Sequence, residues 1–280
     1  MAGHPKIAVV VVAYNSFDEI PQMAATLPSS VSLQLVDNGS DDGLRDWAAQ
    51  NGVPIEVAER NLGFGGGCNL GAAARPEADF YFFLNPDARL TDGAVDALLA
   101  AGERFPQASG FGPKITHPDG RPVSVRVSKL LQGISFQPRK SFPDEDTRLE
   151  HLNGAAMFIR AEAFRQIGGF DENIFMYFED DDLTIRLSRE VGPLYYIPTA
   201  TVVHEGGGST APSPELERFK GYHYARSQIY MRRKLGQRGA FLKGLASALR
   251  RCLSVRLLTG RRSWHDAAGQ VAGAWSMRRG

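Results

Sequence analysis

Runs of apolar residues alternate with amphipathic stretches along the first half of the chain. The run from Ile7 to Ala13 is apolar and mostly β-branched, as expected of a strand covered on both faces of a sheet. Further strands are predicted at residues 32–36, 55–58 and 79–84, and helices at 17–27, 43–50 and from 69 to 74. This β–α alternation predicts an α/β fold with an open, mostly parallel central sheet.

The second half of the chain has a less regular pattern. Residues 112–150 are rich in proline and predict loops or an edge hairpin. Strands are then predicted at 152–160 and 194–203, and helices at 161–167, 178–190 and after Arg218. We therefore predict an α/β domain over residues 1–217 and a helical C-terminal extension over residues 218–280.

Polar clusters directly follow four of the predicted strands. They are Tyr14-Asn15-Ser16, Asp37-Asn38, Asn61-Leu62-Gly63 and Asn85-Pro86-Asp87. Because ligands of open α/β sheets bind at the carboxyl ends of the strands, these clusters predict a ligand site at that edge.

The composition of the chain excludes some classes of protein and indicates a cellular compartment. The chain has 280 residues, of which 43% are hydrophobic and 22% charged, which excludes a disordered or collagen-like protein. Cys68 and Cys252 form neither a disulfide framework nor a CxxC metal site, which indicates a reducing compartment. No apolar run reaches the roughly 18 residues that a membrane span requires, and Ile7–Ala13 lacks the flanks of a signal peptide. We expect a cytoplasmic protein.

The net charge is only +1, but the charged residues are unevenly distributed along the chain. Residues 218–280 hold 15 Lys and Arg and one acid, whereas residues 1–217 hold 17 basic and 30 acidic residues. Within the basic part, residues 240–258 place seven residues on one helical face, opposite Lys243 and Arg250: Phe241, Leu242, Leu245, Ala248, Leu249, Cys252 and Leu253.

This pattern predicts that residues 240–262 bind an anionic membrane surface at the inner face of the cytoplasmic membrane. The alternatives are packing of the helix against the α/β domain or in a homodimer interface. A nucleic-acid partner is not expected, because the basic segment has few aromatic residues on which bases could stack.

A glycine-rich stretch from Asn61 to Asn69 precedes a predicted helix. Glycines at such a position let backbone N–H groups approach a phosphate. This stretch is neither a GxGxxG motif after the first strand nor a P-loop with GK[ST], so these two nucleotide-binding motifs are excluded. A flexible turn without a ligand is the alternative interpretation.

Three strand ends carry groups suited to ligand chemistry. Asp37 can accept a hydrogen bond from the imide N–H of a pyrimidine or from a ribose hydroxyl, or it can form an Asx turn. Asp87 can hold a divalent cation whose other ligands are substrate phosphates and water, or it can belong to a simple turn. His204 ends the last predicted strand and is the second metal candidate.

Four consecutive acids, Glu179-Asp180-Asp181-Asp182, lie between apolar residues. Partial burial next to like charges raises the pKa of a carboxyl group, which suits a general base. The alternative is a set of helix N-terminal acids that the helix dipole stabilises.

Taken in chain order, these motifs resemble the family-2 inverting glycosyltransferases. The matching segments are VVVVAYNS, LVDNGSDDG, ERNLGFGGGCNLG, FFLNPDARL, GAAMFIR, GGFDENIFMYFEDDDL and VVHEGGGST. The Asn-Pro-Asp sequence, where other members carry Asp-x-Asp, is similar to that of the bacterial rhamnosyltransferases. The resemblance covers about residues 6–210 and implies a GT-A fold, the nucleotide-diphospho-sugar transferase sandwich.

The resemblance also implies roles for individual residues. Asp180 corresponds to the catalytic base, with Asp181 and Asp182 as neighbouring alternatives, and Asp87 with His204 would hold Mg²⁺ or Mn²⁺. The donor-binding residues would be Ala13, Tyr14, Asn15, Asp37, Asn61, Gly63, Gly67, Asn69, Asn85 and Asp87. Asn85 replaces the first metal-motif acid, and Asp181 stands where an apolar residue is common.

The implied reaction moves L-rhamnose from dTDP-L-rhamnose, with inversion, to a hydroxyl of a polyprenyl-linked or surface glycan. Transfer from another donor, such as UDP-galactose or UDP-GlcNAc, is one alternative. A non-catalytic nucleotide-sugar-binding protein is the other, and the intact acids at 179–182 count against it.

Overall fold

The structure is a computed structural model of the whole chain. It describes residues 4–126, 130, 140–206, 213–253 and 263–279. The chain divides into two compact units, one of residues 1–171 and 180–210 and the other of residues 172–179 and 211–280. We call them the sheet unit and the helical unit. The sequence analysis expected a boundary at residues 217 and 218, and it did not anticipate that residues 172–179 pack with the C-terminal helices.

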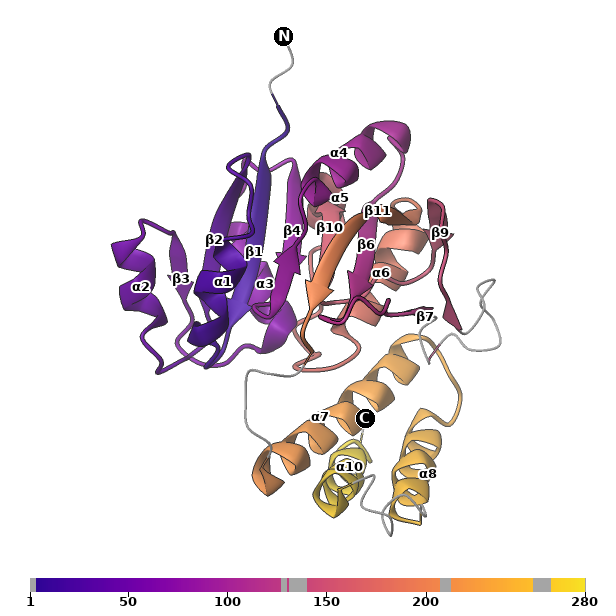
Figure 1. Cartoon of the computed structure of the whole chain (residues 1–280). Coiled ribbons are helices and arrows are strands. Elements are labelled where there is room, and N and C mark those ends of the chain that lie inside the picture. Colours follow the sequence, from indigo (N-terminus) through magenta and orange to yellow (C-terminus); the bar gives the residue numbers. More distant parts are fainter. Residues whose placement is uncertain (1–3, 127–129, 131–139, 207–212, 254–262, 280) are drawn as a thin grey trace. The chain divides into compact units, whose positions relative to one another are not determined.

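The sheet unit is built on one mixed sheet of nine described strands (Figure 1). Its strands are β1 (Ile7–Ala13), β2 (Val31–Asp37), β3 (Ile55–Val57), β4 (Phe80–Leu84), β5 (Ala88–Leu90), β6 (Gly110–Thr116), β9 (Thr147–Leu149), β10 (Ala156–Arg160) and β11 (Leu194–His204). Their order is β3-β2-β1-β4-β10-β6-β11-β5, with β9 paired to β11. A separate small ladder joins β7 (Val125–Arg126) to β8 (Lys140–Ser141).

Strand direction brings several strand ends to one edge of this sheet. Strands β1 to β4 are parallel, as predicted, and β10 runs antiparallel between β4 and β6. In register, Ala13 pairs with Asp37, and Leu84 pairs with Ala156 at the start of β10. The carboxyl ends of β1, β2 and β4 therefore lie at the same edge of the sheet as the beginning of β10.

Helices cover both faces of the sheet (Figure 1). They are η1 (Phe17–Glu19), α1 (Ile20–Ala24), α2 (Leu44–Gln50), α3 (Gly63–Ala73), α4 (Ala94–Arg104), α5 (Ala161–Gln166) and α6 (Glu179–Glu190), the first residue of α6 belonging to the helical unit. Alternate residues of β1 serve two cores: Val9 packs in the core that contains Leu98 of α4, and Val10 in the core that contains Phe164 of α5. The α/β prediction is thus confirmed.

One part of the irregular stretch is a central strand. The prediction of loop or edge hairpin was wrong for residues 112–116, which belong to β6 between β10 and β11. Gly110 and Gly112 leave room for neighbouring side chains, since a Cβ on Gly110 would lie 2.5 Å from Ile159 Cδ1. These glycines and Pro113 hide the apolar pattern by which a strand is usually predicted.

The glycine-rich stretch is helical rather than a loop. The prediction that the helix begins at Asn69 was wrong, because α3 begins at Gly63 and already contains the next three glycines. A Cβ on Gly67 would lie 2.6 Å from Val12 Cγ1, and one on Gly71 would lie 2.5 Å from Val10 Cγ1. Glycine at these positions lets α3 pack closely against β1.

This packing predicts the effect of Gly67→Ala. Alanine is the better helix former, by about 1 kcal/mol, yet we expect the free energy of unfolding to fall by about 1–3 kcal/mol because the new methyl group overpacks against Val12. Urea unfolding measures the change. The double variant Val12→Ala/Gly67→Ala should be less destabilised than the two single changes added together, whereas a more stable Gly67→Ala protein would contradict this account.

The helical unit contains α7 (Pro214–Lys234), α8 (Ala240–Cys252) and α10 (Trp264–Ser276). The helices pack around a small core that includes Ala225, Ile229, Ala248 and Ala274. Residues 172–179 add aromatic rings to this unit: Phe175 contacts Phe219 and His223, and Phe178 contacts Tyr224. Within the described residues, we find no helix with the length and apolar character needed to cross a membrane.

Candidate active site

Three aspartates lie at the sheet edge described above, two of them at strand ends and one in the first turn of a helix. Asp37 is the last residue of β2, and Asp87 follows β4 in the turn that leads to β5. Register pairing of β11 with β5 places His204 opposite Ala88, next to Asp87. Asp180, in the first turn of α6, accepts a hydrogen bond from the backbone N–H of Gly154, just before β10. The sheet thus assembles residues that are far apart in the sequence.

Asp87 and His204 form a close pair. Asp87 Oδ1 lies 3.1 Å from His204 Nε2, and Asn85 Nδ2 lies 3.3 Å from the same nitrogen. The other oxygen of Asp87, Oδ2, accepts a hydrogen bond from Gly206 N at 3.2 Å. A carboxylate oxygen and an imidazole nitrogen at this separation are a donor set that fits a divalent ion such as Mg²⁺ or Mn²⁺. The described part of the chain offers no cluster of three or more His, Cys, Asp or Glu for a metal, so such an ion would need other ligands too.

The acids of α6 have different surroundings. Asp182 is buried, and its Oδ2 is 2.7 Å from both Nε and Nη2 of Arg186. Arg186 also donates to the carbonyl oxygens of Ile167 and Gly169, so the Asp182–Arg186 pair ties α6 to the turn after α5. The side chain of Asp180 is 26% exposed, and its carboxylate accepts hydrogen bonds from the backbone N–H groups of Gly154 and Asp181. Asp180 is therefore the more accessible carboxylate of the two.

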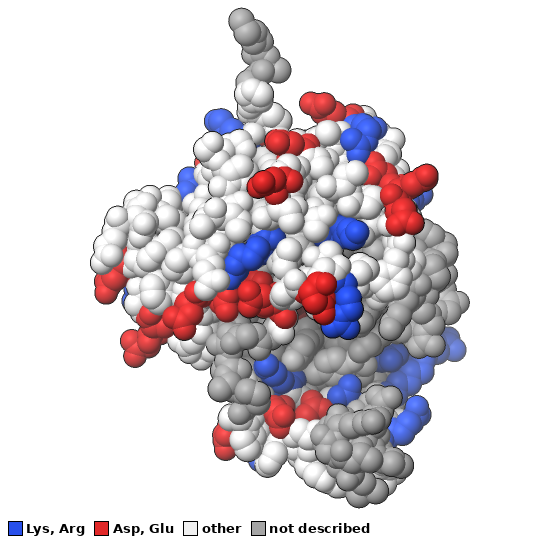
Figure 2. All heavy atoms as spheres, viewed as in Figure 1, with Lys and Arg blue, Asp and Glu red and all other residues white. Residues whose placement is uncertain are grey.

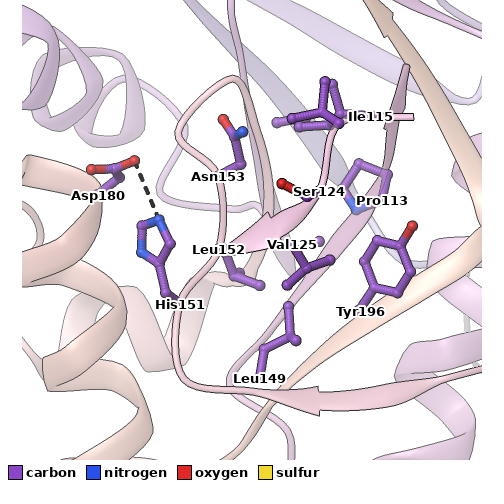
Figure 3. A pocket seen from close by; sticks show the side chains of 13 residues that line it. Pro113, Ile115, Ser124, Val125, Leu149, His151, Leu152, Asn153, Asp180 and Tyr196 are labelled. Carbon is purple, nitrogen blue, oxygen red and sulfur yellow. Dashed lines mark ion pairs between the residues drawn. The ribbon is translucent and has the colours of Figure 1, made fainter. Parts of the chain in front are cut away.

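A cavity of about 140 Å³ lies beside Asp180 (Figure 3). Its walls are mostly apolar, and its polar side chains are Ser124, His151, Asn153, Asp180 and Tyr196. Burial, together with the charge of Asp144, raises the pKa of Tyr196 to about 12, so its phenol stays protonated and can donate a hydrogen bond.

Sequence analysis did not identify His151, which faces Asp180 across 3.8 Å (Figure 3). The residue follows the short strand β9 in a stretch without periodicity, so no sequence signal pointed to it. It becomes visible only because β9 and β10 pair with distant strands of the sheet.

Asp37 is buried, and hydrogen bonds stabilise the negative charge of its carboxylate. Its two oxygens accept hydrogen bonds from Ser40 N, at 2.7 Å, and from Arg45 Nε. Burial raises the pKa of Asp37, but the hydrogen bonds from Ser40 and Arg45 outweigh this and hold the pKa below its ordinary value. The side chain is therefore ionised at neutral pH, and Arg45, which sequence analysis missed, is its partner.

Two predicted donor-binding asparagines hold the backbone around α3. Asn61 Oδ1 accepts hydrogen bonds from Gly63 N and from Asn38 Nδ2, which fixes the beginning of the helix. Asn69 donates to the carbonyl oxygen of Phe170 and accepts from its N–H. Gly67 is buried against Val12. In this structure, these three residues have a positioning role.

The remaining candidates lie at the end of β1. Ala13 is buried, and its carbonyl oxygen accepts a hydrogen bond from Asn38 N. Tyr14 is exposed, and Asn15 has a positive φ of 49° while its side chain accepts from Asp41 N. Tyr14 is exposed and directly follows Ala13, which pairs with Asp37 in the register of β1 and β2.

Known proteins resemble this chain in sequence, and others resemble it in fold. No family model matches the chain. It is 34% identical over 241 residues to the N-acetylglucosaminyl-diphospho-decaprenol L-rhamnosyltransferase of Mycobacterium tuberculosis, covering 74% of this chain and 78% of the relative. It is 39% identical over 220 residues to rhamnosyltransferase WbbL of Escherichia coli, covering 71% of this chain and 83% of the relative.

Solved structures of glycosyltransferases share the fold. GalNAc-T7 with UDP, GalNAc and Mn²⁺ superposes with a TM-score of 0.59 at 16% identity, over 82% of this chain and 51% of that protein. The mannosyltransferase PcManGT of Pyrobaculum calidifontis, in complex with GDP-Man and Mn²⁺, gives 0.56 at 13% identity, over 98% of this chain and 87% of that protein. At these identities the likeness concerns the fold alone.

Proposed function

Because the chain belongs to the rhamnosyltransferase-like group of family-2 glycosyltransferases, which have the GT-A fold, we propose that it transfers L-rhamnose from dTDP-L-rhamnose to a lipid-linked glycan. The observation that carries the proposal is the placement of Asp37, the Asp87–His204 pair and Asp180 along one sheet edge. The name of the mycobacterial relative, which specifies a diphospho-decaprenol acceptor, supports the lipid-linked acceptor.

Asp180 is the general base of the proposed reaction. The acceptor hydroxyl approaches Asp180 from the adjoining cavity and gives its proton to the carboxylate. The acceptor oxygen forms a bond to the anomeric carbon while the bond from that carbon to the donor diphosphate breaks. A single displacement of this kind inverts the configuration. Asp182 is less suited to the role, since it is buried and paired with Arg186.

Asp87 and His204 would hold a divalent metal ion, Mg²⁺ or Mn²⁺. When bound, such an ion neutralises charge on the leaving diphosphate. Asn85 supplies an amide in place of a carboxylate near His204, so this chain contributes less negative charge than an Asp-x-Asp motif does. The presence of Mn²⁺ in the structures of GalNAc-T7 and PcManGT, which share the fold, supports the proposal.

A donor screen tests the proposed function. Purified protein is mixed with dTDP-rhamnose, UDP-galactose, UDP-GlcNAc or GDP-mannose and an N-acetylglucosaminyl diphospho-lipid, and both nucleotide release and glycolipid product are measured. We expect turnover with dTDP-rhamnose. Turnover with a different donor only would refute the choice of rhamnose. Donor binding without turnover of any donor would favour a non-catalytic binding protein.

The nucleotide end of the donor is assigned to Asp37, which would accept the imide proton of a pyrimidine base. Asp37→Ala should weaken donor binding by about 1–3 kcal/mol, because the base loses its hydrogen-bond partner. Arg45→Gln is the matched control, since it removes the ion-pair partner but keeps the carboxylate, and it should weaken binding less. Calorimetry measures both. Equal affinity of the wild type for purine-linked and pyrimidine-linked donors would contradict the assignment.

We propose that the exposed side of α8 contacts a membrane. The apolar face predicted from the sequence is divided in the structure: Gly244 and Ala248 are buried within the helical unit, where Phe241 and Leu245 also pack. Leu242, Leu249 and Leu253 are 68%, 47% and 85% exposed. Their spacing of seven and four residues places them in one stripe along the helix. We call these three residues the leucine stripe.

Basic side chains flank the leucine stripe. Lys243 and Arg250 are exposed next to it, and Figure 2 shows further Lys and Arg on the helical unit. Arg251 has another role, since it pairs with Asp266 at 2.9 Å. Residues 254–262, the rest of the predicted membrane segment, lie outside the described residues. An apolar stripe with basic neighbours suits the interface of an anionic membrane, which supports a peripheral position on the inner face of the cytoplasmic membrane.

Vesicle sedimentation tests this location. The full chain should pellet with phosphatidylglycerol vesicles but not with phosphatidylcholine vesicles, and salt should weaken the effect, since each basic residue near the surface contributes about 1 kcal/mol. Replacing the three leucines of the stripe by glutamine should abolish pelleting. Val57→Gln, at an exposed valine of β3, is the control and should leave it unchanged. Failure of the full chain to pellet at low salt would refute the proposal.

A further inference from the structure

We propose that His151 is a positioning residue for Asp180 and receives the proton that Asp180 takes from the acceptor hydroxyl. The inference rests on the proposed function, because it requires Asp180 to be the base. His151 lies between β9 and β10, and its side chain is only 14% exposed. Figure 3 shows the imidazole at the wall of the cavity, turned toward the carboxylate of Asp180.

A hydrogen bond to Thr184 fixes the orientation of the imidazole. Thr184 Oγ1 donates its single hydrogen to the carbonyl oxygen of Asp180, at 2.6 Å. The hydroxyl can therefore only accept from His151 Nδ1, which lies 3.2 Å away. This assigns the proton of the neutral ring to Nδ1 and leaves a lone pair on Nε2.

The lone pair of Nε2 faces the base. His151 Nε2 lies 3.8 Å from Asp180 Oδ2, while Nδ1 lies 3.7 Å from Asp181 Oδ1. The titratable groups around the ring are thus Asp180 and Asp181 of α6, with Tyr196 of β11 in the same cavity wall. Gly154 allows this approach, since a Cβ there would lie 3.2 Å from Asp180 Oδ2.

The proton balance of the step is simple. The acceptor oxygen bonds to the anomeric carbon, the donor diphosphate leaves with the bonding electrons, and the acceptor proton bonds to Asp180 Oδ2. A movement of about 1 Å would bring Nε2 to the roughly 2.8 Å of a hydrogen bond, through which the proton passes from Oδ2 to Nε2. Asp180 is again a carboxylate, and the resulting imidazolium lies near two negative charges. Water finally takes the proton from Nε2.

The pH dependence of turnover distinguishes this role from simple packing. The ring accepts the proton only while it is neutral, so kcat of the wild type should fall when acid protonates the ring. His151→Gln can keep a hydrogen bond to Thr184 but takes up no proton. We expect its kcat at pH 8 to be about tenfold lower, less than the roughly 10²–10⁴-fold loss for a general base, and its acid limb to lie at a lower pH than that of the wild type.

Two further variants complete the experiment. His151→Ala opens space at the ring position, and added imidazole should restore part of its kcat. His117→Gln, at an exposed histidine in a turn, is the matched control and should keep the wild-type profile. If His151→Gln retains the wild-type kcat and acid limb while Asp180→Asn is inactive, the inference about His151 is refuted and the proposed base stands. If Asp180→Asn is fully active, the proposed base itself is wrong.

Discussion

Asp180→Asn should lower kcat by roughly 10²–10⁴-fold while leaving donor affinity nearly unchanged. Asparagine keeps the shape of the side chain and can still accept the hydrogen bond from Gly154 N, but it cannot take a proton. Initial rates at saturating donor and acceptor measure kcat, and calorimetry measures donor binding. The combination of lost turnover with retained binding separates loss of the base from loss of the fold.

Asp182→Asn is the matched control for this prediction. It leaves the partly buried Arg186 beside a neutral partner, so we expect lower stability and a much smaller effect on kcat per folded molecule. Unfolding curves for both variants correct the rates for the folded fraction. Wild-type turnover in Asp180→Asn together with an inactive Asp182→Asn would move the role of base to Asp182.

Removal of the metal ion should have the second large effect. Stabilisation of the leaving diphosphate by a divalent ion amounts to several kcal/mol, so Asp87→Ala and excess EDTA should each lower turnover by at least about 10²-fold. The structure motivates this expectation through the 3.1 Å contact between Asp87 and His204. Activity assays after chelation, followed by addition of Mg²⁺ or Mn²⁺, measure the loss and its recovery.

Asn85→Asp provides the converse experiment. It restores an Asp-x-Asp sequence beside His204, and the added charge should lower the metal concentration needed for half-maximal activity. Asp87→Ala removes a buried carboxylate that also accepts from Gly206 N, so circular dichroism should confirm that it folds. Full activity of the wild-type protein in excess EDTA is the outcome that rules out a metal requirement.

The parts of the site that could be predicted are those where the sequence changes abruptly from apolar to polar. Asp37 and Asp87 each follow a buried strand, and parallel strands bring such ends to one edge of a sheet. The strand β6 could not be predicted in this way, because Gly110, Gly112 and Pro113 interrupt its apolar pattern. His151 could not be found either, since its proximity to Asp180 depends on strand pairings between distant segments.

Glycine and charge patterns also have more than one structural meaning. The glycines from Gly63 to Gly67 are typical of a phosphate-binding loop, but in this chain they belong to a helix, in which Gly67 allows close packing against Val12 of β1. The apolar face of α8 is partly core and partly exposed, which helical periodicity alone cannot distinguish. In both cases the neighbouring element decides the role of the residues, and that element is far away in the sequence.

The division of the chain between its two units has a consequence for how this protein can be rearranged by recombination. The chain crosses from one unit to the other near residues 171, 179 and 210, so no single break separates them. An exchange of everything after residue 210 would leave Phe175 and Phe178 without the rings of Phe219, His223 and Tyr224 on which they pack. Those two phenylalanines stand within five residues of Asp180. The C-terminal helices and the segment before Asp180 are therefore expected to be inherited together rather than exchanged as a module.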